Sequence, residues 1–288
     1  MPDPANTSIT VRVQARGGKF LGDDIGGAVM TIRDAMTGEL FATGTTAGGS
    51  GALSPTYAAN ASLSAIVTPT SGQSSVQWLL AVDTNSRKTT TSAFTAKLVL
   101  DRPRLLAFEA FGPLGGLQSA HRVTATQWIV PGQNLTQPPG LVLMLPGLLV
   151  QVMSPATHTS FPPSSSPMTL DIAANVAMMC GCPISNAPNN PWLPSDFDVS
   201  AQIREVGGSE VGTVTLGFNK NGTPSLFEGT FRVPSNRTAD AIYYEAIVSA
   251  RQLSTGNVGT GTVTFFTEPV SSPARLWTEH AVSRGRAS

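Results

Sequence analysis

Short stretches in which apolar and polar residues alternate recur along most of the chain. In TSITVRVQA, one face of an extended strand would carry Ile9, Val11 and Val13, and polar side chains would occupy the other face. A period of two residues fits half-buried strands and does not fit helices. Clusters of Gly, Pro, Asn and Ser separate the alternating segments, as turns between strands do. The pattern predicts an all-β protein with two or three consecutive β-sandwich units.

The composition excludes several classes of protein. Charged residues make up only 12% of the 288 residues, about half of the ~25% usual in globular proteins. The formal net charge is zero, which argues against nucleic acid as a partner because phosphate binding needs a basic surface. The longest apolar run, GLVLMLPGLLVQVM, is broken by Pro146 and is shorter than the ~18 residues of a membrane-spanning helix.

The N-terminus MPDPANTSITV lacks the basic and apolar regions of a signal peptide. The low charge and the abundance of Thr, Gly and Ser are nevertheless typical of proteins outside the cytoplasm. We therefore predict an extracytoplasmic protein, secreted, periplasmic or displayed on a surface, whose chain starts at Met1 as an expressed mature form.

Turn-forming segments divide the chain into four predicted regions. Residues 1–101 form a first β-sandwich, in which 61–70, 75–84 and 92–101 are strand candidates. A β-rich middle unit follows at 102–168 and ends in the Pro/Ser-rich loop SPATHTSFPPSSSPM. The remaining two regions are a second β-sandwich at 169–270 and a partly ordered tail at 271–288.

The segment GGAVMTIRDAMTGELFATGTT predicts two strands joined by a turn at Thr37-Gly38. It resembles the start of a carboxypeptidase-regulatory or transthyretin-like β-sandwich. The matching positions are Val13, Ala28, Val29, Ile32, Asp34, Thr37, Gly38, Glu39, Ala42, Gly44 and Thr46. The resemblance covers about forty residues and implies a non-catalytic transthyretin-like module at residues 1–101.

Near the C-terminus, YYEAIVSARQLSTGNVGTGTVTFF resembles the last two strands of bacterial immunoglobulin-like domains. The antibody-type cysteine pair and its tryptophan are absent, so the likeness concerns architecture alone. Upstream, NKNGT lies between two alternating segments and predicts a hairpin turn at Asn221-Gly222. The sequence therefore predicts an immunoglobulin-like sandwich for the third unit.

Both cysteines of the chain lie in VAMMCGCPI. If this segment continues a strand from Asp171, one of its faces is entirely apolar or sulfur-bearing. That face would carry Ile172, Ala174, Val176, Met178, Cys180 and Cys182. Free cysteine is among the most buried residue types, so the first interpretation is a pair of reduced thiols in the core of the third unit. Met179 would then point to the opposite face.

Two other interpretations of the cysteines stay open. Side chains two apart on a strand lie roughly 6–7 Å apart, whereas a disulfide needs β-carbons at roughly 4 Å. Bending at Gly181 would close that gap and leave a strained, reducible bond. Alternatively, Met178, Cys180 and Cys182 would bind Cu(I), with a nitrogen ligand from His158. Copper would then be the cofactor of a metal-handling accessory protein.

Three residues are candidates for other binding. Trp192, in the loop NNPWLP, would either contact a ligand or plug the end of its own core. Asp196 and Asp198 share one face at a strand start and would bind Ca²⁺ with loop carbonyls, or else lie solvated in their loop.

The sequence shows no catalytic motif, since the three histidines are scattered and both H-E-x-x-H and G-x-S-x-G are absent. The first hypothesis is a non-enzymatic protein, without a cofactor, that has a structural, adhesion or assembly role. Its partners would be further copies of itself or another protein. The copper-binding accessory protein is the second hypothesis, and an enzyme with a site built from loops of different units is the third.

Overall fold

The computed structural model describes residues 5–51, 91–137, 139–163, 167–188, 190–236 and 240–269. Within these ranges the protein consists of strands, turns and loops, with helix limited to three short 3-10 turns. The prediction of an all-β, sandwich-type fold is confirmed. The strand candidates at 61–70 and 75–84, and the tail at 271–288, lie outside the described residues.

The described residues of the first half form two four-stranded sheets. In one sheet β1 lies between β4 on one side and β7 and β8 on the other, and in the second the order is β3-β2-β5-β6. The strands are β1 (Ala5–Ala15), β2 (Val29–Asp34), β3 (Leu40–Thr45), β4 (Phe94–Leu100), β5 (Arg104–Gly112), β6 (His121–Ile129), β7 (Asn134–Leu135) and β8 (Leu141–Leu145). Two 3-10 turns, η1 (Asp23–Ile25) and η2 (Leu114–Gly116), contact each other at one end of this first sandwich.

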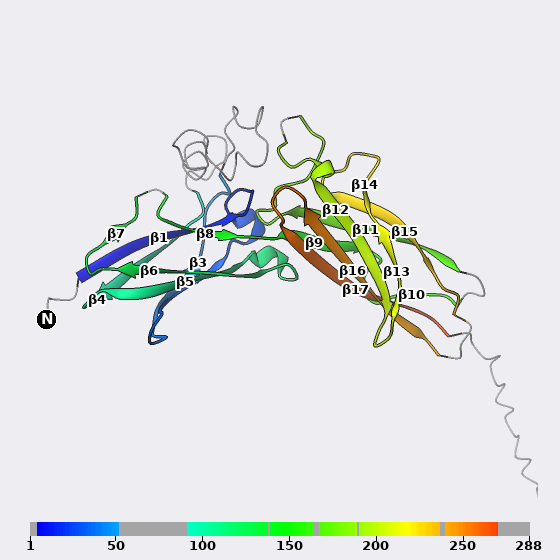
Figure 1. Ribbon diagram of the computed structural model, residues 1–288, viewed down its shortest axis with the longest axis horizontal. Coiled ribbons are helices and arrows are strands. Elements are labelled where there is room, and N and C mark those ends of the chain that lie inside the picture. The colour runs from blue at the N-terminus through cyan, green and yellow to red at the C-terminus, as the bar shows by residue number, and fades with distance from the viewer. Residues whose placement is uncertain are drawn as a thin grey trace, which may run out of the picture.

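The second half forms a four-stranded sheet of order β14-β15-β11-β9 and a five-stranded sheet of order β10-β17-β16-β12-β13. The strands are β9 (Leu148–Ser154), β10 (Thr159–Phe161), β11 (Met168–Met178), β12 (Phe197–Glu205), β13 (Glu210–Thr215), β14 (Gly217–Phe218), β15 (Leu226–Val233), β16 (Ile242–Gln252) and β17 (Val258–Thr267). The turn η3 (Pro194–Asp196) precedes β12. Figure 1 shows the two sandwiches following one another along the long axis of the molecule.

The strand pairing corrects the predicted unit boundaries. The expected division at residue 102 separates β4 from β5, yet β5 pairs with β2, and β8 pairs with β1. The Pro/Ser-rich loop, expected to end a middle unit, instead connects strands of the second sandwich, because β9 before it pairs with β11 after it. The change of sandwich comes at Pro146-Gly147, between β8 and β9. The described strands thus form two sandwiches, with the expected middle unit divided between them.

Strand β1 is buried on both faces, although its alternation predicted burial on one face alone. Ile9 and Val11 lie in the core, and the polar side chains of Arg12 and Gln14 are also buried. The Arg12 guanidinium donates to the carbonyl of Pro139 at 2.7 Å, and the Gln14 amide donates to the carbonyl of Gly18 at 3.1 Å. A central strand therefore carries polar groups whose hydrogen bonds partly compensate their burial.

The predicted hairpin at Thr37-Gly38 is present between β2 and β3. The carboxylate of Asp34 accepts hydrogen bonds from the backbone N–H groups of Met36 at 2.8 Å and Thr37 at 3.0 Å. These bonds, aided by an ion pair with Arg104 at 3.0 Å, lower the pKa of Asp34. Gly38 has a φ of 78°, a conformation that favours glycine. The local hairpin is thus confirmed, and the transthyretin-like family resemblance stays a prediction.

Glycines on β17 allow the edge strand β9 to approach closely. A β-carbon on Gly261 would lie 2.7 Å from the carbonyl oxygen of Val150, and one on Gly259 would collide with the carbonyl of Leu148. Strand β9 therefore packs against β17 while it pairs with β11. Strand β9 thus joins the two sheets of the second sandwich, and its first residue, Leu148, lies beside the end of β11 at Met178.

Candidate functional site

The sandwiches meet at a junction built from loops of both halves. The first sandwich contributes residues 16–27 and 113–120, and the second contributes residues 179–193 and 252–258. Only Pro146 and Gly147 connect β8 to β9 at this point. Most of the residues singled out in the sequence lie at or beside this junction.

The cysteines lie in a hairpin turn and not on a continuous strand. Strand β11 ends at Met178, whose N–H donates to the carbonyl of Cys182 at 3.1 Å, and Gly181 donates to the carbonyl of Met178 at 2.8 Å. Gly181 has a φ of 75°, as glycine has in three-residue hairpin loops with a bulge. The strand alternation therefore stops at Met178 and does not continue to Cys182 as expected.

Both cysteines are free thiols and are buried, as the first interpretation predicted. The Sγ of Cys180 accepts a hydrogen bond from the backbone N–H of Lys19 in the first sandwich at 3.4 Å. Gly18 also packs on this sulfur, because a β-carbon there would lie 3.1 Å from it. Met179 is fully buried as well, and its expected orientation away from the cysteines stays a prediction. The cysteines thus belong to the junction between the sandwiches.

We expect the protein to lose stability at alkaline pH because of the buried thiol of Cys182. Hydrogen bonding with Cys180 and burial raise its pKa well above the usual value. The folded state therefore prefers the protonated thiol, so the stabilisation is complete below the unfolded-chain pKa of about 8.5 and is lost as the pH rises above it. We expect the free energy of unfolding, measured with urea, to decline above about pH 8.5.

The matched variant is Cys182→Ala. Its free energy of unfolding at neutral pH should be lower than that of the parent by on the order of 1–2 kcal/mol. Between about pH 8 and 9.5, the free energy of unfolding should fall less in the variant than in the parent. Burial also raises the pKa of Tyr244, whose contribution begins above about pH 10 and stays outside this window. An equally steep decline in the variant and the parent protein would contradict the assignment to Cys182.

The structure does not assemble the predicted copper ligands. Leu148 pairs with Met178 beside the junction, whereas Ser154 pairs with Ala173 further along β11. His158 follows Ser154 at the far end of the sandwich, and its N–H donates to the carbonyl of Thr264 at 2.7 Å. Within the described part of the chain, no group of three or more His, Cys, Asp or Glu side chains is placed to hold a metal ion. The copper hypothesis therefore loses its nitrogen ligand.

Trp192 does not face solvent, which corrects its candidacy as a binding residue. Only 4% of the side chain is exposed, and the indole N–H donates to the carbonyl of Gly17 at 2.9 Å. The geometry supports the second interpretation of this loop, in which Trp192 closes the end of a hydrophobic core. That core is shared with the first sandwich. The indole N–H of Trp192 is a direct link between the two halves of the chain.

Asp196 and Asp198 do not converge as a calcium site would require. Asp196 accepts hydrogen bonds from the hydroxyl and N–H of Ser254 at 2.6 and 2.9 Å and from the Gln252 amide at 3.0 Å. It therefore holds η3 against the β16–β17 turn. Asp198 forms an exposed ion pair with Arg251 at 3.6 Å and borders an open hollow of about 340 Å³ with otherwise uncharged walls.

Asn257 is a junction residue that was not among the candidates from the sequence. Its side chain is buried, and its amide nitrogen donates to the carbonyl of Arg16 at 2.9 Å and to the amide oxygen of Gln252 at 3.0 Å. Its amide oxygen accepts the N–H of Gly147 at 3.1 Å. One asparagine thus ties the first sandwich, the connector and the second sandwich together.

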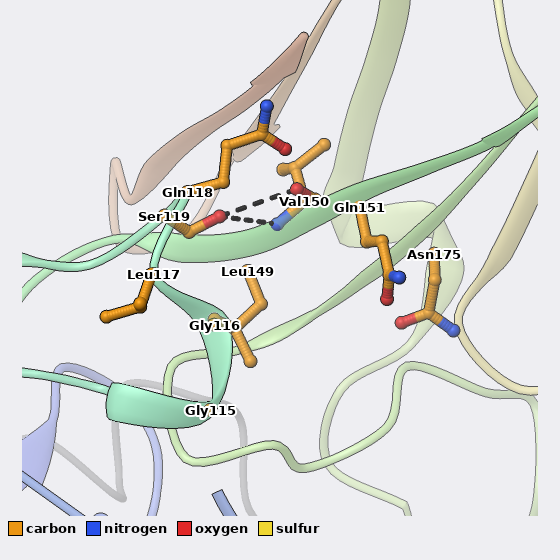
Figure 2. Close-up of a pocket in the computed structure, with 9 residues that line it drawn as sticks. All are labelled: Gly115, Gly116, Leu117, Gln118, Ser119, Leu149, Val150, Gln151 and Asn175. Carbon is orange, nitrogen blue, oxygen red and sulfur yellow. Dashed lines mark hydrogen bonds between the residues drawn. The ribbon is translucent and has the colours of Figure 1, made fainter. Parts of the chain in front are cut away.

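A pocket of about 300 Å³ opens beside the junction, as Figure 2 shows. One wall is the η2 turn with the residues after it, and the floor is formed by β9 and β11. Its lining residues are Gly115, Gly116, Leu117, Gln118, Ser119, Leu149, Val150, Gln151 and Asn175. The hydroxyl of Ser119 accepts the N–H of Val150 at 3.0 Å and joins the wall to the floor.

The chemistry of this pocket is that of a binding site. Its polar side chains are the primary amides of Gln118, Gln151 and Asn175 and the hydroxyl of Ser119. None of the lining residues is a group that titrates near neutral pH, so the pocket offers no general acid or base. The hydroxyl of Ser119 is hydrogen-bonded to the backbone of β9. The nearby ring of His121 contacts the backbone carbonyl of Ser119 at 3.1 Å and not its hydroxyl, so the two side chains do not form a nucleophile–base pair. The arrangement can hold a ligand by hydrogen bonds and apolar contact.

Comparisons with known proteins give no family for this chain. No family model and no curated protein matches it. Among solved structures, the chicken interferon gamma receptor alpha chain aligns with a TM-score of 0.29 and 11% identity, covering 93% of this chain and 98% of that chain. The zebrafish RET cadherin-like domains 1 to 4 align with a TM-score of 0.17 and 10% identity, covering 65% and 40%. Likenesses at this level assign no function.

Proposed function

We propose that this chain is a non-enzymatic β-sandwich protein with a structural, adhesion or assembly role outside the cytoplasm. The observation that carries the proposal is the junction. The two cysteines and Trp192 are buried there, where they join two sandwiches into one elongated body. No helix in the described ranges has the length and apolar character that crossing a membrane requires.

The junction has the properties of a fixed joint. Interfaces between domains of one chain usually permit motion unless they are extensive and hydrophobic. Here the buried apolar core runs continuously from the first sandwich into the second. Buried or partly buried hydrogen bonds donated by Trp192, Asn257 and Lys19 cross the same boundary. Moving the sandwiches apart would expose these groups to water or leave them unpaired, so a single rigid body is favoured.

The enzyme hypothesis finds less support in the geometry. A site made from loops of different units is what the pocket beside η2 provides, and its lining lacks a nucleophile with its base or a pair of carboxylates. The accessory copper protein is also less favoured, because Met178, Cys180 and Cys182 are nearly inaccessible. A structural role needs only the rigid arrangement of the two sandwiches and no reactive or metal-binding group.

Assembly with further copies of the chain is favoured by its surface. A net charge of zero means that two copies do not repel each other, and few charged groups need to lose water at an interface. Trp128, the largest side chain exposed on β6, is 63% exposed, and Val130, two residues further on, is 49% exposed. Trp128 lies opposite Leu105 on the same sheet face. This apolar face fits a second copy of the same composition.

Sedimentation of the full chain at several concentrations tests the proposal. We expect the average mass to rise with concentration and the Trp128→Ser variant to require at least about tenfold more protein for the same rise, equivalent to about 1.4 kcal/mol. Met36→Ser removes an exposed side chain elsewhere and serves as the control, with association unchanged. A parent protein that stays monomeric at every concentration would count against assembly from copies of itself.

A further inference from the structure

We propose that the pocket between the η2 turn and strands β9 and β11 binds a short uncharged peptide segment of a partner protein. Gln151 and Asn175 would hold its backbone, and Leu117 and Leu149 would contact one apolar side chain. The inference goes beyond the proposed function, because it concerns a different surface and requires no association between copies of the chain.

The two amides at the floor of the pocket form a matched pair. Gln151 on β9 lies directly opposite Asn175 on β11 in the antiparallel register, a position that places β-carbons about 4.5–5.5 Å apart. Figure 2 shows their amide groups next to each other at one side of the pocket. Neither amide has a hydrogen-bond partner among the described residues, whereas Gln118 at the opposite side already donates to the carbonyl of Thr262 at 2.8 Å.

The chemistry of two free amides matches a peptide backbone. Each carboxamide offers two donors and one acceptor oxygen, and an extended peptide presents N–H and C=O groups in alternation. A charged ligand would lose water without meeting an opposite charge, because none of the lining residues is ionised at neutral pH. The pocket therefore favours a neutral stretch of chain over a carboxylate, phosphate or ammonium group.

The remaining walls suit one apolar side chain. Leu117 is 64% exposed at the mouth of the pocket, and Leu149 is half-buried at its base. Gly116 keeps the space between them open, because a β-carbon there would lie 2.8 Å from Cδ2 of Leu149. No aromatic ring lines the pocket, so a sugar ring would find no flat apolar face on which to stack. Two leucines instead provide contact for an aliphatic group.

The size of the pocket limits how much of a partner it can take. Its volume of about 300 Å³ is at the lower end of the range of roughly 300–1,000 Å³ for ligand sites. One residue with its two flanking peptide groups is a ligand of that scale. The partner would therefore insert a loop or a chain segment rather than dock a broad surface here.

Nuclear magnetic resonance on the ¹⁵N-labelled full chain tests this assignment with N-acetyl-leucine N-methylamide as the probe. We expect the side-chain NH₂ signals of Gln151 and Asn175 to shift with a saturable dependence on probe concentration. Asn175→Asp removes the donors and adds a charge with almost no change in size, and should weaken binding at least tenfold. Asn221→Asp, on the exposed β14–β15 turn, is the matched control and should bind the probe as the parent does.

Three results would overturn the inference: no saturable shift with the parent protein, unchanged affinity in Asn175→Asp, or shifts with methyl glucoside in place of the blocked leucine. The backbone spectrum of each variant verifies its fold in the same experiment. Since sedimentation reports association and this titration reports the pocket, the peptide site can fail while assembly holds, and the reverse is equally possible.

Discussion

Replacing Trp192 with alanine is expected to lower the free energy of unfolding by about 3–5 kcal/mol, the range for removing a large buried aromatic side chain. The indole is 4% exposed and closes the core where the two sandwiches meet. Its removal leaves a cavity and also deprives the carbonyl of Gly17 of its hydrogen bond. Because the lost contacts join the two halves, the variant should also unfold in two steps where the parent unfolds in one.

Urea unfolding followed by circular dichroism measures both effects. Trp128→Ala provides the control, because that side chain is 63% exposed on β6 and its loss should change stability by no more than about 0.5 kcal/mol. A cost of less than about 1 kcal/mol for Trp192→Ala, or a single unchanged transition, would show that the junction does not depend on this residue.

Much of the local structure could be predicted from the sequence. Alternation identified β1 and β4, because a strand with a buried face must repeat its apolar residues every second position. Turn chemistry identified the hairpins at Gly38 and Gly222, where φ is 78° and 71°. These predictions succeeded because each depends on interactions within a few residues.

The partner of each strand could not be predicted in the same way. Alternation shows that a face of β1 is buried and does not show that β4 and β8 flank it. Strand β8 begins more than a hundred residues after β1, and nothing in either segment marks the other. The predicted boundary at residue 102 was wrong for this reason, since it followed turn-forming residues and not strand pairing.

The same limit applies to the candidate site. The alternation predicted that Cys180 is buried, although the residue lies in the turn after β11. Its contact with Lys19 comes from a loop of the other sandwich. The pocket joins Gln118 to Gln151 and Asn175, three amides from different elements that look like ordinary surface residues in the sequence. Their proximity arises from the way the β5–β6 connection meets β9, which only the fold reveals.

Changing Asn257 to aspartate should be among the most damaging conservative substitutions in the chain. The asparagine amide nitrogen donates to two oxygen acceptors, the carbonyl of Arg16 and the side-chain oxygen of Gln252. A carboxylate cannot donate, and its charge would face both acceptors in a site that is 1% exposed. The expected loss of unfolding free energy is on the order of 3–5 kcal/mol, as for an uncompensated buried charge.

The pH dependence of this variant separates the charge from the lost hydrogen bonds. Because the folded state disfavours the ionised carboxyl group, the new aspartate should retain its proton to a higher pH than in the unfolded chain. Its penalty should therefore be small below about pH 4 and should grow as the pH rises. Asn257→Ala removes the same donors without adding a charge, so its cost should be smaller and constant across that range. Urea unfolding of both variants from acid to neutral pH distinguishes the two contributions, and equal costs at neutral pH would show that solvent reaches Asn257 and that the junction is open.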